Sequence, residues 1–402
     1  MQIELKKRTF VGGEVELPAS KSISNRALIM LGTEADLQNL SLCQDSLVLR
    51  NALSEWPYRI DVGAAGTAMR FLTALLSASS GEHILTGSAR MKQRPIAPLV
   101  DALRGLGARI DYTEQEGFPP LHIMGKDLQG GKITISGNVS SQFISALIMV
   151  APRMKEGLQI EITGEILSRP YIDMTLALQC HFGISSRWIS DHDILVPPGL
   201  YKPVTYHIEN DWTAASYWYE AVALSQDDGS TVFLPGLSMD SLQGDYVVRQ
   251  LFEPLGVTTE RTSGGIRLTK APCTARQMKL DFRDNPDLAQ TLVVTCTLMN
   301  VPFCFSGLES LRIKETDRIL ALITEMKRIG YVLSQPTPNV LTWDGTRCTA
   351  EKSPLIQTYQ DHRMAMAFAP ASFRMESICI NHPEVTDKSY PDFFQQFLHN
   401  TR

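Results

Sequence analysis

Long hydrophobic runs and an excess of positive charge are both missing from this sequence. Apolar stretches such as Ala146–Val150 fall far short of the about 20 residues that a membrane-spanning helix needs. The formal net charge is −5 and no basic stripe runs along the chain, which disfavours binding to the phosphate backbone of nucleic acids. The first residues, MQIELKKRTF, alternate like a strand and lack the apolar segment of a signal peptide. We therefore expect a cytoplasmic protein that binds neither membrane nor nucleic acid.

Cysteine pairs and metal-ligand spacings are also scarce. The seven cysteines are scattered, none of them in a CxxC pair, and several lie inside apolar runs. We expect them to be buried small side chains in a reducing compartment. The eight histidines show no HxxxH spacing, so no metal site is expected. The nucleotide-binding signatures GxGxxG after a strand and GxxxxGK[ST] are missing as well.

The patterns that are present alternate between strand-like and helix-like segments. Residues Lys132–Ser136 and Leu158–Thr163 alternate with the period of half-buried strands. An amphipathic helix followed by glycine and a strand recurs at Ile96–Ile110, Leu251–Glu260 and Ile319–Leu333. With 402 residues, the chain is too long for one ordinary core. The sequence therefore predicts an α/β protein of two domains.

Polar residues crowd the predicted start of a helix in the segment LPASKSISNRALI. Ser20 is suited to cap this helix, and the cations Lys21 and Arg26 lie near its start. Comparable helix starts recur in the segments 64–72 and 138–149. Free N–H groups and the positive end of the helix dipole favour bound anions at such positions. One such stretch alone is more typical of a capped amphipathic helix with solvated cations, but the recurrence favours an anionic ligand.

Further charged segments have both a structural and a functional interpretation. In KETDR, Glu315 and Arg318 are spaced for an ion pair on a helix face, which is the commonest explanation for such a segment alone. The segment DHRMAMAF, which contains Arg363, suits a capped core helix as well as a ligand site. Asp287 suits a helix cap. The residues alone leave these alternatives open.

Nine segments together resemble one enzyme family, in the family's order. They are SKSISNRA, AGTAMRFLTA, RMKQRPI, VSSQFISALIM, SRPYIDMTL, PDLAQT, IKETDR, YQDHRMAM and KSYPDFF, and they extend from Leu17 to about Phe394. The family is that of the 5-enolpyruvylshikimate-3-phosphate synthases, or 3-phosphoshikimate 1-carboxyvinyltransferases. Any one of these segments alone is weak evidence for the family. All nine would match by coincidence only if the structural explanation of each segment were right independently.

The resemblance implies an α/β fold of two similar domains. Each would contain three βαβαββ units, arranged as an inside-out α/β barrel of the enolpyruvyl transferase type. The implied N-terminal domain is 20–208 and the C-terminal domain is 1–19 plus 209–402, with the active site in the cleft between them. The N-terminal strand would then pair with the C-terminal domain.

The reaction implied by the resemblance transfers the enolpyruvyl group of phosphoenolpyruvate to the 5-hydroxyl of shikimate 3-phosphate and releases phosphate. It belongs to chorismate and aromatic amino-acid biosynthesis and needs no metal or organic cofactor, and the family suggests a monomer. The implied catalytic residues are Lys21, Asp287 and Glu315. Asp287 would accept the hydroxyl proton and Glu315 would transfer a proton at carbon, with the division of roles between Glu315 and Lys21 left open.

The resemblance also implies two sets of binding residues. Those for shikimate 3-phosphate are Lys21, Ser22, Arg26, Ser140, Ser141, Ser168, Tyr171, Asp287, Ser310 and Lys314. Those for phosphoenolpyruvate are Lys21, Gly66, Arg94, Gln142, Arg318, Arg363 and Lys388. Arginine is suited to bidentate binding of carboxylate and phosphate, whereas lysine acts more as a point charge.

The sequence departs from the family pattern at several places. Ala64 and Ser310 stand where asparagine is usual, and Asn210 replaces the glycine of a turn. The segment Cys43–Gly63 is shorter than typical, which predicts one trimmed unit in the first domain. A non-catalytic shikimate-phosphate-binding relative of the same fold is therefore the alternative function. The related enolpyruvyl transfer to a UDP-aminosugar is disfavoured, because that family has a Lys-Asn motif and a reactive loop cysteine.

Overall fold

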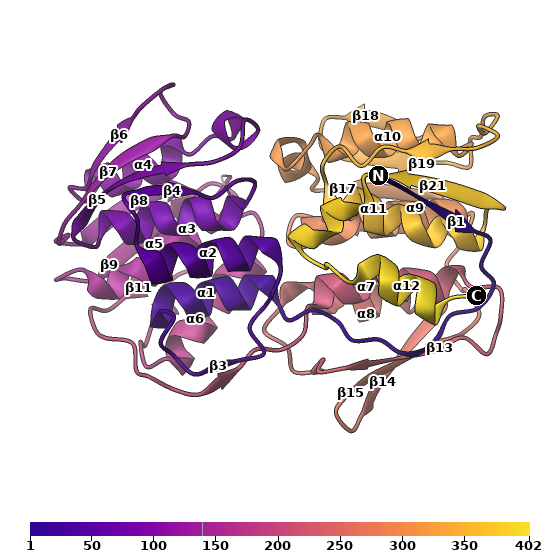
Figure 1. Cartoon of the computed structure of the whole chain (residues 1–402), viewed down its shortest axis with the longest axis horizontal. Helices are drawn as coiled ribbons and strands as arrows, with labels where there is room; N and C mark the ends of the chain where they lie inside the picture. Colours follow the sequence, from indigo (N-terminus) through magenta and orange to yellow (C-terminus); the bar gives the residue numbers. More distant parts are fainter. Residues whose placement is uncertain (139) are drawn as a thin grey trace. The chain divides into compact units, whose positions relative to one another are not determined.

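The chain forms two compact units in the computed structural model, which describes residues 1–138 and 140–402. One unit comprises Ala19–Ile208, and the other comprises Met1–Pro18 together with Glu209–Arg402 (Figure 1). We call them the N-terminal unit and the C-terminal unit. Each has a hydrophobic core of its own. Among the described residues, no helix has the length and apolar character needed to cross a membrane.

Two four-stranded sheets of the N-terminal unit each come from one βαβαββ segment. The first sheet has the order β4 (Arg59–Asp61), β5 (Gly81–Thr86), β7 (Leu121–Gly125), β6 (Arg109–Tyr112), and the second has the order β10 (Arg187–Trp188), β11 (Asp193–Val196), β9 (Leu158–Thr163), β8 (Gly131–Ser136). In each, the first two strands of the segment are parallel and the last two form an antiparallel pair. The remaining sheet found in the described part of this unit has two parallel strands, β3 (Leu37–Gln38) and β12 (Tyr206–His207). Both of its strands lie outside the segment Cys43–Gly63, so the expected trimming of one unit there stays a prediction.

The N-terminal unit has six helices and two 3-10 turns among its described residues. They are α1 (Lys21–Leu31), α2 (Gln44–Glu55), α3 (Gly66–Ser77), α4 (Ala97–Gly105), α5 (Ser141–Val150) and α6 (Arg169–His181), with the 3-10 turns η1 (Met91–Gln93) and η2 (Ala151–Arg153). Helix α5 is buried almost all round because it packs between α3 and α6 (Figure 1). The Oγ atoms of Ser20 and Ser140 accept hydrogen bonds from backbone N–H groups one turn into α1 and α5, at 3.4 and 3.3 Å. The predicted cap at Ser20 is confirmed.

The C-terminal unit also contains three sheets in its described residues. Their orders are β14 (Val257–Thr262), β15 (Gly265–Lys270), β13 (Thr231–Pro235), β2 (Gly12–Glu14); β16 (Met278–Asp281), β17 (Phe303–Ser306), β19 (Val340–Trp343), β18 (Ser334–Thr337); and β1 (Gln2–Lys6), β21 (Ser377–Asn381), β20 (Leu355–Ile356). Strand β1 lies antiparallel to β21, with Gln2 opposite Asn381. The predicted pairing of the N-terminal strand with the C-terminal part of the chain is confirmed.

The C-terminal unit has six helices and five 3-10 turns among its described residues. They are α7 (Trp212–Leu224), α8 (Val248–Phe252), α9 (Ala289–Leu298), α10 (Arg318–Arg328), α11 (His362–Phe368) and α12 (Phe393–Asn400), with the 3-10 turns η3 (Gly244–Val247), η4 (Pro286–Leu288), η5 (Glu309–Ile313), η6 (Ala369–Phe373) and η7 (Pro383–Lys388). Helices α7, α9 and α11 are buried along their lengths and pack against one another. Their apolar surfaces fix the backbone from which the site residues project.

One of the alternatives left open by the sequence, and one expectation, are wrong. The segment KETDR does not lie on a helix face, because the Asp317 carboxylate accepts hydrogen bonds from the first N–H groups of α10 and the helix starts only at Arg318. The cysteines are not all buried: Cys180 and Cys273 are exposed. Cys180 lies near the end of α6 and Cys273 lies in the loop after β15, where the chain reaches the surface.

Candidate active site

Four cationic side chains and three carboxylates gather in the C-terminal unit. They project from η4, from the segment between η5 and α10, from the first turns of α10 and α11, and from the end of η7. We call this set the charged cluster; it comprises Asp287, Lys314, Glu315, Arg318, Asp361, Arg363 and Lys388. The cluster is built from long-range contacts, because its members come from the chain between residues 287 and 388.

Arg318 is the centre of the charged cluster and is 1% exposed. Its Nε donates to Asp361 at 2.7 Å, its Nη1 to Asp287 at 2.9 Å, and its Nη2 to Glu315 at 3.1 Å. Burial alone would lower the pKa of this guanidinium, but Asp361, Glu315 and Asp287 together raise it. The planar fork of arginine thus fixes three carboxylates around one cation.

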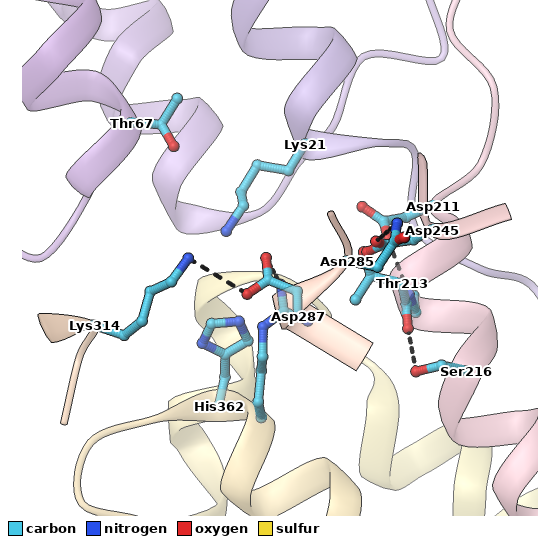
Figure 2. A network of polar contacts seen from close by, with 12 residues as sticks. Lys21, Thr67, Asp211, Thr213, Ser216, Asp245, Asn285, Asp287, Lys314 and His362 are labelled. Carbon is cyan, nitrogen blue, oxygen red and sulfur yellow. Dashed lines mark hydrogen bonds and ion pairs between the residues drawn. The ribbon is translucent and has the colours of Figure 1, made fainter. Parts of the chain in front are cut away.

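The Asp287 carboxylate contacts three cations. Its Oδ1 lies 2.9 Å from Nη1 of Arg318 and 3.6 Å from Nζ of Lys314, and its Oδ2 lies 2.8 Å from Nη2 of Arg363. Figure 2 shows the contact between Asp287 and Lys314. Burial favours the neutral acid, but Arg363, Lys314 and Arg318 outweigh it and hold the pKa of Asp287 well below its usual value. The carboxylate is therefore ionised, but it is a weak base while it keeps these partners.

Glu315 joins the opposite side of the charged cluster. Its Oε2 accepts from Arg318, and its Oε1 lies 2.5 Å from Nζ of Lys388. Asp287 and Glu315, the two predicted catalytic carboxylates of this unit, thus both accept hydrogen bonds from Arg318. Asp287 also accepts from Arg363, and Glu315 also accepts from Lys388. A small anionic ligand that binds these cations must compete with Asp287 and Glu315.

The sequence interpretation missed one member of the charged cluster, Asp361. Its Oδ1 accepts from the backbone N–H of Arg363 at 2.9 Å and caps α11, while its other oxygen binds Arg318. An aspartate immediately before an apolar helical run is a recognised start signal, so the cap was detectable. Its contact with Arg318 was not, because the two residues are 43 positions apart. Ser310, in η5, donates no hydrogen bond to the charged cluster in the described structure.

In the N-terminal unit, two arginines converge on the start of α3. A Cβ atom added to Gly66 would lie 2.7 Å from Nη1 of Arg94 and 2.8 Å from Nη1 of Arg70. Both arginines are largely buried, at 9% and 5% exposure. The absence of a side chain at Gly66 thus leaves room for two guanidinium groups beside the helix start, and Nη1 of Arg70 donates to the carbonyl of Gly66 at 3.0 Å. Cations beside a helix start favour an anion. Arg70 was not among the predicted binding residues.

Two further predicted residues lie at the starts of helices in this unit. Lys21, the first residue of α1, places its Nζ 3.2 Å from Oδ2 of Asp45, whose side chain is 5% exposed. The Nε2 atom of Gln142 donates to Oγ1 of Thr67 at 3.3 Å, which joins the start of α5 to the start of α3. Ser140 and Ser141 form the start of α5 itself.

Arg26 is engaged differently from the other predicted binding cations. Its Nε donates to Oγ1 of Thr175 at 2.7 Å, and its two Nη atoms donate to Ser22, Ser145 and the carbonyl of Tyr171. Burial lowers the pKa of Arg26 to about 10, with Tyr171 acting in the opposite direction. Arg26 therefore ties α1 to α5 and α6, and most of its donors are used inside the unit. Ser168 lies at the N-cap of α6 in the left-handed conformation, with φ of 57°.

No group of three or more His, Cys, Asp or Glu side chains suited to a metal ion occurs in the part of the chain that the structure describes. The charged cluster is instead a set of four cations, each of which pairs with Asp287 or Glu315, the two carboxylates that are candidates for proton transfer. Such a set suits substrates that carry phosphate and carboxylate groups.

Comparisons with known proteins identify first the fold and then the family. The structure of an EPSP synthase from Acinetobacter baumannii has a TM-score of 0.78 and covers 100% of this chain and 98% of that one, at 22% identity. The fold is therefore the one that this class of transferase has. A family model described as EPSP synthase (3-phosphoshikimate 1-carboxyvinyltransferase) matches residues 30–397, and the chain belongs to this family.

Curated relatives agree with the family assignment. A 3-phosphoshikimate 1-carboxyvinyltransferase of Bacteroides fragilis (strain YCH46) is 55% identical over 383 residues, which cover 94% of this chain and 93% of that protein. The enzyme with the same name from Vibrio cholerae serotype O1 (strain M66-2) is 35% identical over 426 residues, which cover 98% and 97%.

Proposed function

We propose that this chain transfers the enolpyruvyl group of phosphoenolpyruvate to the 5-hydroxyl of shikimate 3-phosphate, and that the charged cluster and Lys21 carry the chemistry. The 5-oxygen attacks C2 of phosphoenolpyruvate and a proton is added at C3, which gives a tetrahedral intermediate. Loss of a proton from the new methyl group then expels phosphate and leaves the enolpyruvyl ether. The observation that carries the proposal is the Asp287 carboxylate held by Lys314, Arg318 and Arg363.

The binding residues of the proposal are those expected from the sequence. Phosphoenolpyruvate is bound by Lys21, Gly66, Arg94, Gln142, Arg318, Arg363 and Lys388, and shikimate 3-phosphate by Lys21, Ser22, Arg26, Ser140, Ser141, Ser168, Tyr171, Asp287, Ser310 and Lys314. Arg26 has most of its donors engaged within the N-terminal unit, and Ser310 is shorter than the usual asparagine.

The proposed base is activated by the substrate. A carboxylate or phosphate of phosphoenolpyruvate that binds Arg318 and Arg363 withdraws both cations from Asp287. Since these cations hold the pKa of Asp287 low, their withdrawal raises the basicity of the carboxylate towards the range useful for proton transfer. Asp287 then accepts the proton of the attacking hydroxyl.

Glu315 undergoes the same exchange on the other side of the charged cluster. Once the substrate anion binds Arg318 and Lys388, the carboxyl of Glu315 is released to move a proton at C3 of the enolpyruvyl group. Lys21, as a cation, donates a proton near the bridging oxygen of the leaving phosphate. The positive charge that remains around the tetrahedral intermediate stabilises the developing anions.

A cytoplasmic location and a monomeric state are part of the proposal. The alternative, a binder without turnover, rested on Ala64, Ser310 and the shortened segment 43–63. None of these departures removes a side chain of the charged cluster, and no observation favours the alternative.

Phosphate release from the purified protein, given both substrates, tests the proposed function. Three proteins are compared: the wild type, Asp287→Asn, and Asp240→Asn. The last removes a carboxylate whose side chain is 78% exposed and which pairs with Arg261 on the surface. Release that requires both substrates, is retained in Asp240→Asn and falls about 10²- to 10⁴-fold in Asp287→Asn supports the proposal. An inactive wild type that still binds shikimate 3-phosphate overturns it in favour of the binder.

A further inference from the structure

A buried aspartate outside the charged cluster contacts the turn that carries Asp287. Asp245 lies in η3 and is 2% exposed. Its Oδ1 accepts a hydrogen bond from Nδ2 of Asn285 at 3.2 Å, and its Oδ2 accepts one from Oγ1 of Thr213. Figure 2 shows these side chains beside Asp287. Neither Asp245 nor its partners stood out in the sequence.

The bond to Asn285 fixes the turn on its N-terminal side. Asn285 is the residue before η4, which begins with a buried proline and has Asp287 at its centre. Its backbone N–H donates to the carbonyl of Phe282 at 3.2 Å, and its own carbonyl accepts from Leu288 at 3.1 Å. The side-chain bond to Asp245 is therefore a third restraint on this residue, two positions before Asp287.

The bond to Thr213 leads to the other side of the same turn. The carbonyl of Thr213 accepts from Oγ of Ser216 at 2.7 Å, and this hydroxyl lies 3.2 Å from Oγ1 of Thr291. Thr291 is in the first turn of α9, the helix that continues directly from η4. Asp245 is thus linked to the residue before Asp287 and, through α7, to the helix after it.

The Asp245 carboxyl also lies within electrostatic reach of Asp287. Burial and the charge of Asp287 raise the pKa of Asp245 to about 6, against the opposing effects of Thr213, Arg363 and Asn285. The carboxyl therefore changes its charge near pH 6.

Other charged groups on the elements packed against η3 have contacts of their own. Asp211 caps α7 by accepting from the backbone N–H of Ala214 at 2.9 Å. The guanidinium of Arg249, in α8, lies over the ring of Tyr246 at 4.3 Å. Glu220, in α7, is fully buried, and burial raises its pKa well above the usual value. Asp287 and Arg363 are thus the charges most directly coupled to Asp245.

We propose that Asp245 is a positioning residue for Asp287: it holds the turn that presents the Asp287 carboxylate to Arg318 and Arg363. Its negative charge, when present, also makes Asp287 a better base. The inference rests on the proposed function of Asp287, but it assigns to Asp245 no contact with substrate. Its removal must therefore affect the rate of turnover more than the binding of either substrate.

Steady-state kinetics of four variants test this role against the wild type. Asp245→Ala and Asn285→Ala each remove the restraint on the turn, and both are expected to lower kcat about 10- to 100-fold, with KM for each substrate within about twofold of the wild type. Asp245→Asn keeps a hydrogen-bond acceptor for Asn285. Below about pH 6, its kcat is therefore expected to recover most of the loss seen in Asp245→Ala. Asp240→Asn, the surface control, is expected to match the wild type.

The pH dependence of kcat separates positioning from general destabilisation. In the wild type and in Asn285→Ala, log kcat is expected to rise through about pH 6 as Asp245 ionises. In Asp245→Asn this step is expected to be absent. Should Asp245→Ala fail to fold, Asn285→Ala decides, because it leaves the carboxyl in place.

Two results would overturn the inference. One is a kcat within twofold of the wild type in the alanine variants. The other is a loss confined to KM, which would mean that the residues act on binding. A wild type that releases no phosphate overturns both the proposed function and this inference. An active wild type together with alanine variants of unchanged kcat overturns only the inference.

Discussion

Replacement of Asp287 by asparagine should have opposite effects on turnover and on anion binding. The charged cluster contains four cations and three carboxylates, a formal charge of +1. Removal of one carboxylate makes the charge +2, and it frees the guanidinium groups that Asp287 contacts at 2.8 and 2.9 Å. An anion that competes with Asp287 in the wild type should therefore bind more tightly to the variant, although the variant turns over far more slowly.

The size of the gain follows from the distances. One unit charge about 4 Å from another is worth about 4 kcal/mol at an effective dielectric constant of about 20. Asp287 retains 17% side-chain exposure, and the asparagine amide still offers an oxygen to one arginine, so most of this is screened or replaced. We expect about a tenfold gain in the affinity for inorganic phosphate, which corresponds to about 1.4 kcal/mol.

Calorimetric titration with inorganic phosphate at low ionic strength measures this gain. Asp240→Asn changes the net charge by the same amount at an exposed ion pair, so it controls for the overall field of the protein. Equal or weaker phosphate binding by Asp287→Asn, with Asp240→Asn like the wild type, would refute the competition between Asp287 and the substrate anion. A gain shared by both variants would refute its local origin.

Three further predictions concern stability and binding. The pKa of Asp287 is lower in the folded protein than in the unfolded chain. Its contribution to the free energy of unfolding is therefore complete above the unfolded pKa of about 4 and is lost as the pH falls below it. In urea unfolding, the stability difference between the wild type and Asp287→Asn should shrink between about pH 5 and pH 3. Gly66→Ala places a Cβ atom 2.7 Å from the flexible end of Arg94, so the chain should still fold. The KM for phosphoenolpyruvate should rise about tenfold, which corresponds to about 1.4 kcal/mol of binding free energy. An unchanged KM contradicts this prediction. Burial raises the pKa of Glu220 well above its usual value, so the folded protein keeps a proton that the unfolded chain loses above about pH 4.3. The wild type therefore loses stability as the pH rises. The urea midpoint of Glu220→Gln should increase relative to that of the wild type between about pH 5 and pH 8.

Local features of the fold were predictable from local patterns. The helix starts at Ser20 and Ser140 depend on a side chain that bonds to N–H groups within the next turn, which the sequence shows directly. The strands Lys132–Ser136 and Leu158–Thr163 were evident from their alternation, because one face of each packs on a core.

Contacts between distant segments were not predictable in the same way. Arg318 was expected to pair with Glu315, three residues away, and it does; its contacts with Asp287 and Asp361 span 31 and 43 positions. Family resemblance supplied Asp287, but not Asp361 or Asp245, which contact no substrate in the proposed mechanism. Residues that act through other residues leave no pattern of their own in a single sequence.

The pairing of β1 with β21 has a consequence for the order in which the chain can fold during synthesis. All of Ala19–Ile208 leaves the ribosome as one uninterrupted segment, so the N-terminal unit can complete its core first. Strands β1 and β2 are made earlier still, yet β2 must wait for Thr231–Phe233 and β1 for Ser377–Asn381. These two strands are thus made before the N-terminal unit but find their neighbours only after it, because the N-terminal unit lies between them and those neighbours along the chain. In a nascent chain stopped before β21, the N-terminal unit would be folded while β1 would still lack its partner strand.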